Sequence, residues 1–224
     1  MIAALSLAVA TFLATVPWGE GLIALLRMQG IGKQIRADGP QSHEVKRGTP
    51  TMGGALFLAP VLVFGGLLAW RTPRLWAPLA ITFAFGALGA VDDLRGLRDT
   101  EGVGWLARWK FPWQAALGLA GGVALYVAGA PHTVALPVVH LTIDLGLGYI
   151  PAAAFVIVSM ANAVNFDDGL DGLAGGTSVA AFAAIGAMAL AGARADPALA
   201  LLSAVFVGGI LAFLWYNEIG RAHV

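Results

Sequence analysis

Three polar segments interrupt an otherwise apolar chain, and they hold the side chains best suited to chemistry. In the most acidic, 162–172, Asp167, Asp168 and Asp171 fall within five residues, with no lysine or arginine beside them. Asp168 and Asp171 would share one face if this segment were helical. Carboxylates this close need a cation or distant basic side chains, unless the segment is a solvated loop. The glycines and asparagines around them favour a shaped binding loop.

A second acidic feature, Asp92–Asp93, directly follows a long apolar run. Acidic side chains at the edge of a membrane are costly unless solvated, paired or metal-bound, and they are usually functional. The pair could hold Mg²⁺, which prefers oxygen ligands and is often shared with substrate phosphates, or one carboxylate could act as a general base. The alternative is a solvated helix end in which the acids pair with Arg95 and Arg98.

The third segment, 42–54, is basic and rich in groups that bind anions, including Lys46, Arg47 and Thr49. Such side chains, with glycine and threonine backbone donors, could hold a phosphate. The alternative is a basic anchor that precedes a membrane span. Carboxylates that could hold a metal ion and basic side chains that could hold phosphates together favour phosphoryl transfer, because that reaction depends mostly on positioning and charge stabilisation.

The elements that must position these segments are predicted to be membrane-spanning helices. The chain is 58% hydrophobic and 12% charged, with a mean hydropathy of +0.80, whereas soluble domains have about 25% charged residues. We predict an all-α polytopic bundle in one domain, 1–217, with a polar tail at 218–224 and a short extracytoplasmic β-hairpin near 133–147. Seven spans are predicted, at about 2–26, 52–70, 75–91, 112–130, 149–164, 177–193 and 198–216.

Basic residues predict the orientation of these spans. The first and third connections contain five and four lysines or arginines, whereas the second, fourth and sixth contain two, none and one. Because short basic loops stay in the cytoplasm, the N-terminus is predicted outside and the three polar segments inside. The absence of cysteine excludes disulfides and thiolate metal sites. We expect the lipid bilayer and no nucleic acid as a partner, and a homodimer is left open.

On these residues the chain resembles the phospho-N-acetylmuramoyl-pentapeptide transferases (MraY), within the polyprenyl-phosphate hexose-1-phosphate transferase (glycosyltransferase 4) family. The resemblance covers nearly the whole chain, up to Asn217. The segments that carry it are Lys46–Gly54, Asp92–Asp93, Trp109–Phe111 with Gln114, Asn162–Asn165, Asp168–Ala174 and Phe213–Asn217.

The resemblance implies an enzyme of peptidoglycan synthesis in the bacterial inner membrane. It would transfer phospho-MurNAc-pentapeptide from UDP-MurNAc-pentapeptide to undecaprenyl phosphate, releasing UMP and forming lipid I, with Mg²⁺ as cofactor. Asp92 and Asp93 would be the catalytic residues and metal ligands: Asp92 would deprotonate the lipid phosphate, and Asp93 would support the metal or the diphosphate. Direct attack and a covalent intermediate are both left open. The implied substrate-binding residues are Lys46, Thr49, Lys110, Asn165, Asp168 and Asp171.

Several features depart from the family pattern. Asp167 stands where the family usually has a small polar residue, often threonine, and Arg95 replaces a usual lysine. The family has about ten spans, and its usual Mg²⁺ aspartate lies in a loop beyond the segment that ends at Asn217, where this chain has 218–224. We therefore expect an incomplete copy, inactive alone and poorly stable in detergent.

Three alternatives to this function remain. A GlcNAc-1-phosphate transferase is disfavoured by the Thr49–Gly54 segment. A transporter is disfavoured because its charges should lie within spans along a path, whereas the acids here lie at span ends on one side. A non-catalytic fragment is the third alternative.

Overall fold

The computed structural model describes residues 1–28, 53–98, 105–136, 141–168, 172–191 and 195–218. These residues form seven long helices, two short 3₁₀ turns and one antiparallel strand pair, so the predicted all-α fold with one hairpin is confirmed. The long helices are α1 (Ile2–Met28), α2 (Gly54–Arg71), α3 (Trp76–Arg98), α4 (Ala107–Val127), α5 (Tyr149–Asp167), α6 (Leu173–Leu190) and α7 (Pro197–Glu218). The shorter elements are η2 (Pro73–Leu75), β1 (Thr133–Leu136), β2 (Leu141–Asp144) and η3 (Gly146–Gly148).

Six of the seven long helices are long and apolar enough to cross a membrane. The remaining helix, α4, has 21 residues but begins with Arg108, Lys110 and Gln114, which lower its mean hydropathy. Large apolar side chains such as Leu67 and Phe155 point outwards and are 65% and 74% exposed. Such an apolar exterior suits a helical bundle whose solvent is lipid. The protein is therefore a multi-pass membrane protein.

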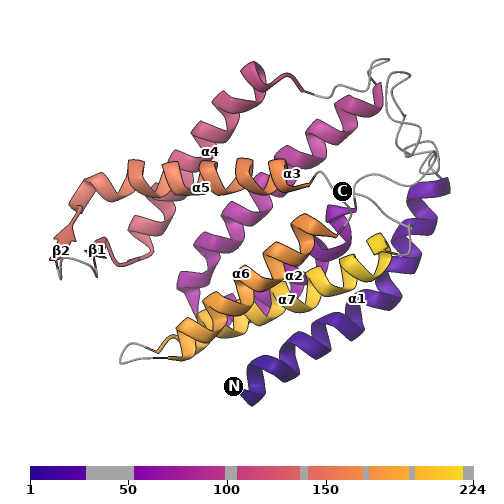
Figure 1. Cartoon of the computed structure of the whole chain (residues 1–224), viewed down its shortest axis with the longest axis horizontal. Helices are drawn as coiled ribbons and strands as arrows, with labels where there is room; N and C mark the ends of the chain where they lie inside the picture. Colours follow the sequence, from indigo (N-terminus) through magenta and orange to yellow (C-terminus); the bar gives the residue numbers. More distant parts are fainter. Residues whose placement is uncertain (29–52, 99–104, 137–140, 169–171, 192–194, 219–224) are drawn as a thin grey trace.

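Helix α7 lies at the centre of the bundle, between α1, α2 and α6 (Figure 1). Of its apolar stretch 61% is buried, against at most 22% in the other five candidate spans. Phe206 of α7 stacks on Phe182 of α6 with ring centroids 4.4 Å apart, and Val205 is fully buried. Helices α4 and α5 form a second pair, which joins the rest mainly through α3.

Small and polar residues allow α1 to approach α7 closely. A side chain at Gly208 would clash with the backbone carbonyl of Ala8, so only glycine fits this crossing. Thr11 and Thr15 are fully buried in α1, and each hydroxyl donates to the carbonyl oxygen four residues earlier in the same helix. The hydroxyl of Tyr216 in α7 donates to the carbonyl oxygen of Val16 at 2.5 Å, which fixes the end of α7 against α1.

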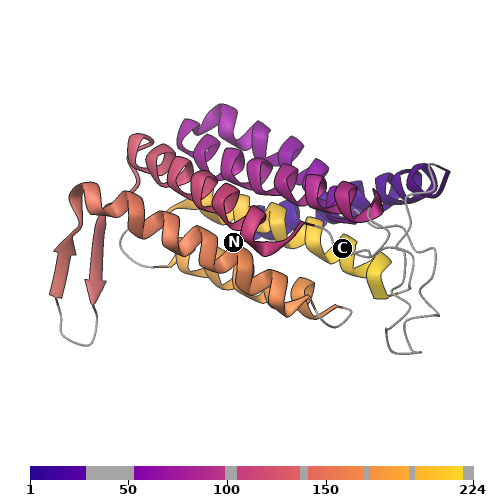
Figure 2. The same cartoon turned by 90° about the horizontal axis from the view of Figure 1, so that it is seen from above.

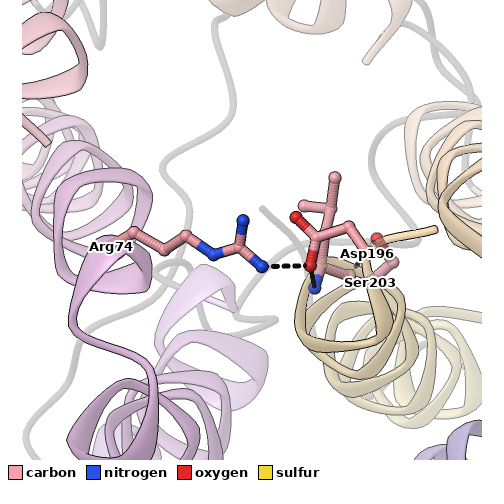
Figure 3. A network of polar contacts seen from close by, with 4 residues as sticks. Arg74, Asp196 and Ser203 are labelled. Carbon is pink, nitrogen blue, oxygen red and sulfur yellow. Dashed lines mark hydrogen bonds and ion pairs between the residues drawn. The ribbon is translucent and has the colours of Figure 1, made fainter. Parts of the chain in front are cut away.

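The bundle has two distinct ends. Helices α3, α5 and α7 end, and α4 and α6 begin, towards one end, whereas the hairpin and the N-terminus lie towards the other (Figures 1 and 2). At the hairpin end, Arg74 donates to Asp196 Oδ1 at 2.7 Å. The same oxygen accepts the backbone N–H of Leu199 at 3.0 Å and so caps α7 (Figure 3). This ion pair ties the α2–α3 turn to the α6–α7 connection.

The hairpin follows α4 and leads into α5. Strands β1 and β2 pair antiparallel, with Thr133 opposite Asp144, and this confirms the hairpin predicted near 133–147. Asp144 Oδ1 accepts the backbone N–H of Gly146 at 2.8 Å and lies 2.6 Å from His132 Nδ1. The Gly146 bond first, and then the His132 bond, hold the pKa of Asp144 below its ordinary value.

Candidate active site

The acidic pair Asp92–Asp93 lies on α3, which continues to Arg98. The membrane span predicted at about 75–91 is therefore too short, since the candidate span covers Pro73–Leu97. A change in hydropathy marks where the apolar stretch stops, whereas the helical backbone hydrogen bonds continue through Leu94 and Leu97. Both carboxylates are accordingly held by a regular helix and are only partly exposed.

Asp92 is bound by two donors from the next part of the chain. Lys110 Nζ donates to Asp92 Oδ2 at 2.6 Å, and the backbone N–H of Trp105 donates to Asp92 Oδ1 at 2.8 Å. The two charged side chains are each 21% exposed. Bonds between ionised groups at this distance are among the strongest hydrogen bonds in proteins. Because Lys110 lies in the first turn of α4, the ion pair fixes the start of α4 against α3.

Arg95, which sequence alone offered as a partner for the acids, is engaged elsewhere. Its guanidinium lies 4.2 Å from the centre of the Trp105 ring, a cation–π distance. The backbone of Trp105 therefore binds Asp92 while its indole binds Arg95. The side chain of Arg98, the other suggested partner, lies outside the described residues.

A partly buried amide pair joins α4 to α5 one turn beyond Lys110. Asn162 Nδ2 donates to Gln114 Oε1 at 3.1 Å and to the carbonyl oxygen of Val158 at 2.8 Å. Gln114 is only 6% exposed, so the contact satisfies a polar group that would be costly to bury alone. It also fixes α5 against α4 at a point three residues before Asn165.

The acidic segment begins on α5 and ends at α6. Helix α5 runs to Asp167, three residues beyond the predicted span, and Asp168 is its C-cap residue. Asp167 Oδ2 accepts a hydrogen bond from the hydroxyl of Thr177 at 2.6 Å. Asp167, which departs from the family pattern, therefore links the end of α5 to α6. Asn165 is exposed at this end of the bundle.

Asn217 holds the other side of the same segment. Its Oδ1 accepts the backbone N–H of Gly172 at 3.0 Å, and the side chain is 6% exposed. Gly172 has a φ of +78° and precedes α6, a backbone conformation that glycine adopts without strain. Sequence reasoning placed Asn217 in a motif without giving it a role, because its partner lies 45 residues away.

The predicted site residues fall into three groups. Asp92 and Lys110 are in direct contact. Asp93, Asn165 and Asp168 lie at the same end of the bundle, on or at the ends of α3 and α5 (Figure 1). Three further residues lie outside the described part of the chain, namely Lys46, Thr49 and Asp171.

The donor set at this end fits a magnesium ion shared with a substrate. Within the described residues, no three acidic or histidine side chains gather into a ready-made metal site. Mg²⁺ commonly uses one or two carboxylates and completes its shell with water and phosphate oxygens. Each Asp92 oxygen accepts one hydrogen bond, and a carboxylate has about four acceptor positions. Asp92 can therefore still offer oxygen ligands.

Two comparisons with known proteins bear on this arrangement. A family model described as glycosyl transferase family 4 matches residues 75–224, from η2 through α7. The chain belongs to glycosyl transferase family 4. The phospho-N-acetylmuramoyl-pentapeptide-transferase signature 1 also matches, over residues 46–58.

The two matches confirm the resemblance found in the sequence. The glycosyl transferase family 4 region contains the acidic pair, Lys110 and the acidic segment, and signature 1 contains Lys46 and Thr49. The chain is therefore a phospho-sugar transferase of the MraY type, with membrane-spanning helices that suit a lipid-linked acceptor.

Proposed function

We propose that this transferase moves phospho-MurNAc-pentapeptide from UDP-MurNAc-pentapeptide to undecaprenyl phosphate, giving lipid I and UMP. The observation that carries the proposal is signature 1 at residues 46–58, which bears the name of this activity within a broader family. The Asp92 end would face the cytoplasm of a bacterial inner membrane and the N-terminus would face outside. The basic residues of the first and third connections support that orientation.

The overall reaction joins a lipid phosphate oxygen to the β-phosphorus of the nucleotide sugar. The bond between that phosphorus and the oxygen bridging to the α-phosphate breaks, and the electron pair leaves with UMP. A direct attack gives this outcome in one step, whereas an enzyme nucleophile would give it in two. In either route, several negative phosphates must meet at the site, so positive charge and correct positioning dominate catalysis.

The Asp92–Lys110 pair suits the approach of an anion. Lys110 balances the charge of Asp92, and its ammonium has three N–H donors, of which Asp92 uses one. A phosphate oxygen could accept another without breaking the ion pair. Asp92 can take the proton of the lipid phosphate on an acceptor position that Lys110 and Trp105 leave unused.

The other predicted residues would each bind the metal or a different part of the substrates. Asp92 and Asp93 would hold Mg²⁺, which would neutralise phosphate charge as the leaving group departs. Asn165, Asp168 and Asp171 would line the nucleotide side. Lys46 and Thr49 would contact phosphates, since both belong to the matched signature. The bonds from Thr177 and Asn217 would hold the acidic segment in place.

Lipid I formation tests the proposal directly. The purified chain in nanodiscs would receive labelled UDP-MurNAc-pentapeptide, undecaprenyl phosphate and Mg²⁺, with labelled UDP-GlcNAc in a parallel reaction. Product should come from the first donor only and be lost on chelation of the metal, whereas no product from either donor would mean that the chain is inactive alone, as its departures from the family pattern predict. Asp92→Asn should abolish product, whereas Asp196→Asn, which removes a carboxylate at the opposite end of the bundle, should retain it. Product from UDP-GlcNAc alone would instead identify a GlcNAc-1-phosphate transferase.

A further inference from the structure

The β1–β2 hairpin has one apolar face. Val134 pairs with Ile143, and Leu136 pairs with Leu141. Because side chains alternate along a strand, all four project from the same side of the hairpin. The opposite side carries Thr133, Ala135, Thr142 and Asp144.

This apolar face is uncovered within the described part of the chain. Its four side chains are between 40% and 51% exposed, and all eight strand residues are exposed. An isolated two-stranded hairpin is marginally stable in water and usually needs one face packed on something. The apolar face therefore needs a packing partner, and the described helices do not provide one.

The base of the hairpin lies at a membrane boundary. The candidate span that contains α5 begins at Gly146, two residues after β2 ends. Tyr126 near the end of α4 and Tyr149 at the start of α5 lie with ring centroids 6.4 Å apart. Tyrosines are enriched where a span meets the lipid headgroups. The base of the hairpin therefore lies where a membrane span begins.

The direction of the strands favours contact with the membrane surface. In Figure 2 the strands run across the direction of α4 and α5 and do not extend it. When α5 crosses the bilayer, the hairpin must therefore run along the surface. Amphipathic helices lie in the interface with their apolar face about 5–10 Å into the headgroup boundary, and a hairpin with one apolar face can be held there in the same way.

We propose that the β1–β2 hairpin is an interfacial anchor whose apolar face rests in the lipid headgroup region at the N-terminal end of the bundle. Residues 128–148 contain no lysine or arginine, so apolar contact and not attraction to anionic lipid provides the binding. A second protein is a poorer fit, because stable interfaces bury about 800 Å² on each partner and this face has four side chains. The anchor sets the depth of α4 and α5, whose other ends carry Lys110 and Asp167.

The absence of native cysteine allows a direct test with single labels. Ile143→Cys places an environment-sensitive fluorophore on the apolar face, and Thr142→Cys places it on the opposite face of the same strand. Val134→Cys and Ala135→Cys repeat the comparison on β1, in case one substitution disturbs the pairing. Each variant is reconstituted at one copy per nanodisc, with nitroxide-labelled lipid or with aqueous iodide as the quencher.

We expect lipid-borne nitroxide to remove most of the fluorescence at positions 143 and 134, while iodide acts mainly at 142 and 135. Equal quenching by iodide on both faces would overturn the proposal, because the face would then be in water. Protection at position 143 that requires two copies per nanodisc and resists the nitroxide would also overturn it, in favour of a contact between copies.

Discussion

The ion pair between Asp92 and Lys110 should make a measurable contribution to stability. The charged atoms lie 2.6 Å apart and each side chain is 21% exposed. At an effective dielectric constant of about 20, their attraction is roughly 6 kcal/mol before desolvation is subtracted. Hydrogen bonds to charged groups contribute about 1.5–3 kcal/mol net. We therefore expect a coupling free energy of about 2 kcal/mol, since the pair is only partly buried.

A double-mutant cycle isolates this coupling. Unfolding of the wild-type chain, Asp92→Asn, Lys110→Met and the double variant would be followed thermally under one set of detergent conditions. The double variant should be less destabilised than the sum of the single variants by about 2 kcal/mol, or about 4–8 °C in a chain of this size. The pair Arg74–Asp196 is the matched control, because its 2.7 Å distance is similar but Arg74 is 54% exposed. Its coupling should stay below about 1 kcal/mol.

Two results would refute this reasoning. Additivity of the Asp92 and Lys110 substitutions within about 0.5 kcal/mol would show that the two charges do not stabilise each other in the folded protein. An equal coupling at the exposed control pair would show that burial is not what strengthens the interaction.

Three further predictions concern other parts of the molecule. The pKa of Asp144 is lowered in the folded protein, so its carboxylate stabilises the hairpin at pH values above its ordinary pKa, and this stabilisation is lost as the pH falls through the lowered pKa. Hydrogen exchange of the strands should therefore become faster in acid, relative to an Asp144→Asn variant measured at each pH. Asn217→Ala leaves a backbone N–H before α6 without its acceptor, so exchange there should speed up and unfolding should become easier by about 1 kcal/mol. A Cβ at Gly122 would lie 2.5 Å from the carbonyl oxygen of Ile150, whereas one at Gly21 would meet nothing within 4 Å. Gly122→Ala should thus cost about 1–3 kcal/mol in thermal unfolding, and Gly21→Ala should cost nothing.

The helices and the hairpin could be predicted because each depends on local signals. Long apolar runs in lipid must become helices, and this holds for α7 as well as α2. Alternation around Val134 and Leu136 predicted a strand in the same way. Helix ends were less predictable, since α3 and α5 continue into polar residues where their backbone bonds persist.

The site could be predicted only in part, because its contacts join distant segments. Arg95 was the nearer candidate partner for Asp92, yet Lys110, 18 residues away, forms the bond. No signal in the neighbouring sequence indicates that the guanidinium of Arg95 lies over the Trp105 ring. The roles of Lys46 and of the metal remain predictions, since these depend on residues and ligands beyond those described.

The contact between α1 and α7 has a consequence for biosynthesis. The bond from Tyr216 to Val16 joins residues 200 positions apart, and ribosomes add about 5–20 residues per second. Helix α1 therefore waits roughly 10–40 seconds for α7 to be synthesised. During that time the hydroxyls of Thr11 and Thr15, which α7 will later cover, face lipid or other helices. Because both already donate within α1, the nascent helix can remain in the bilayer with its polar atoms satisfied until its partner is inserted.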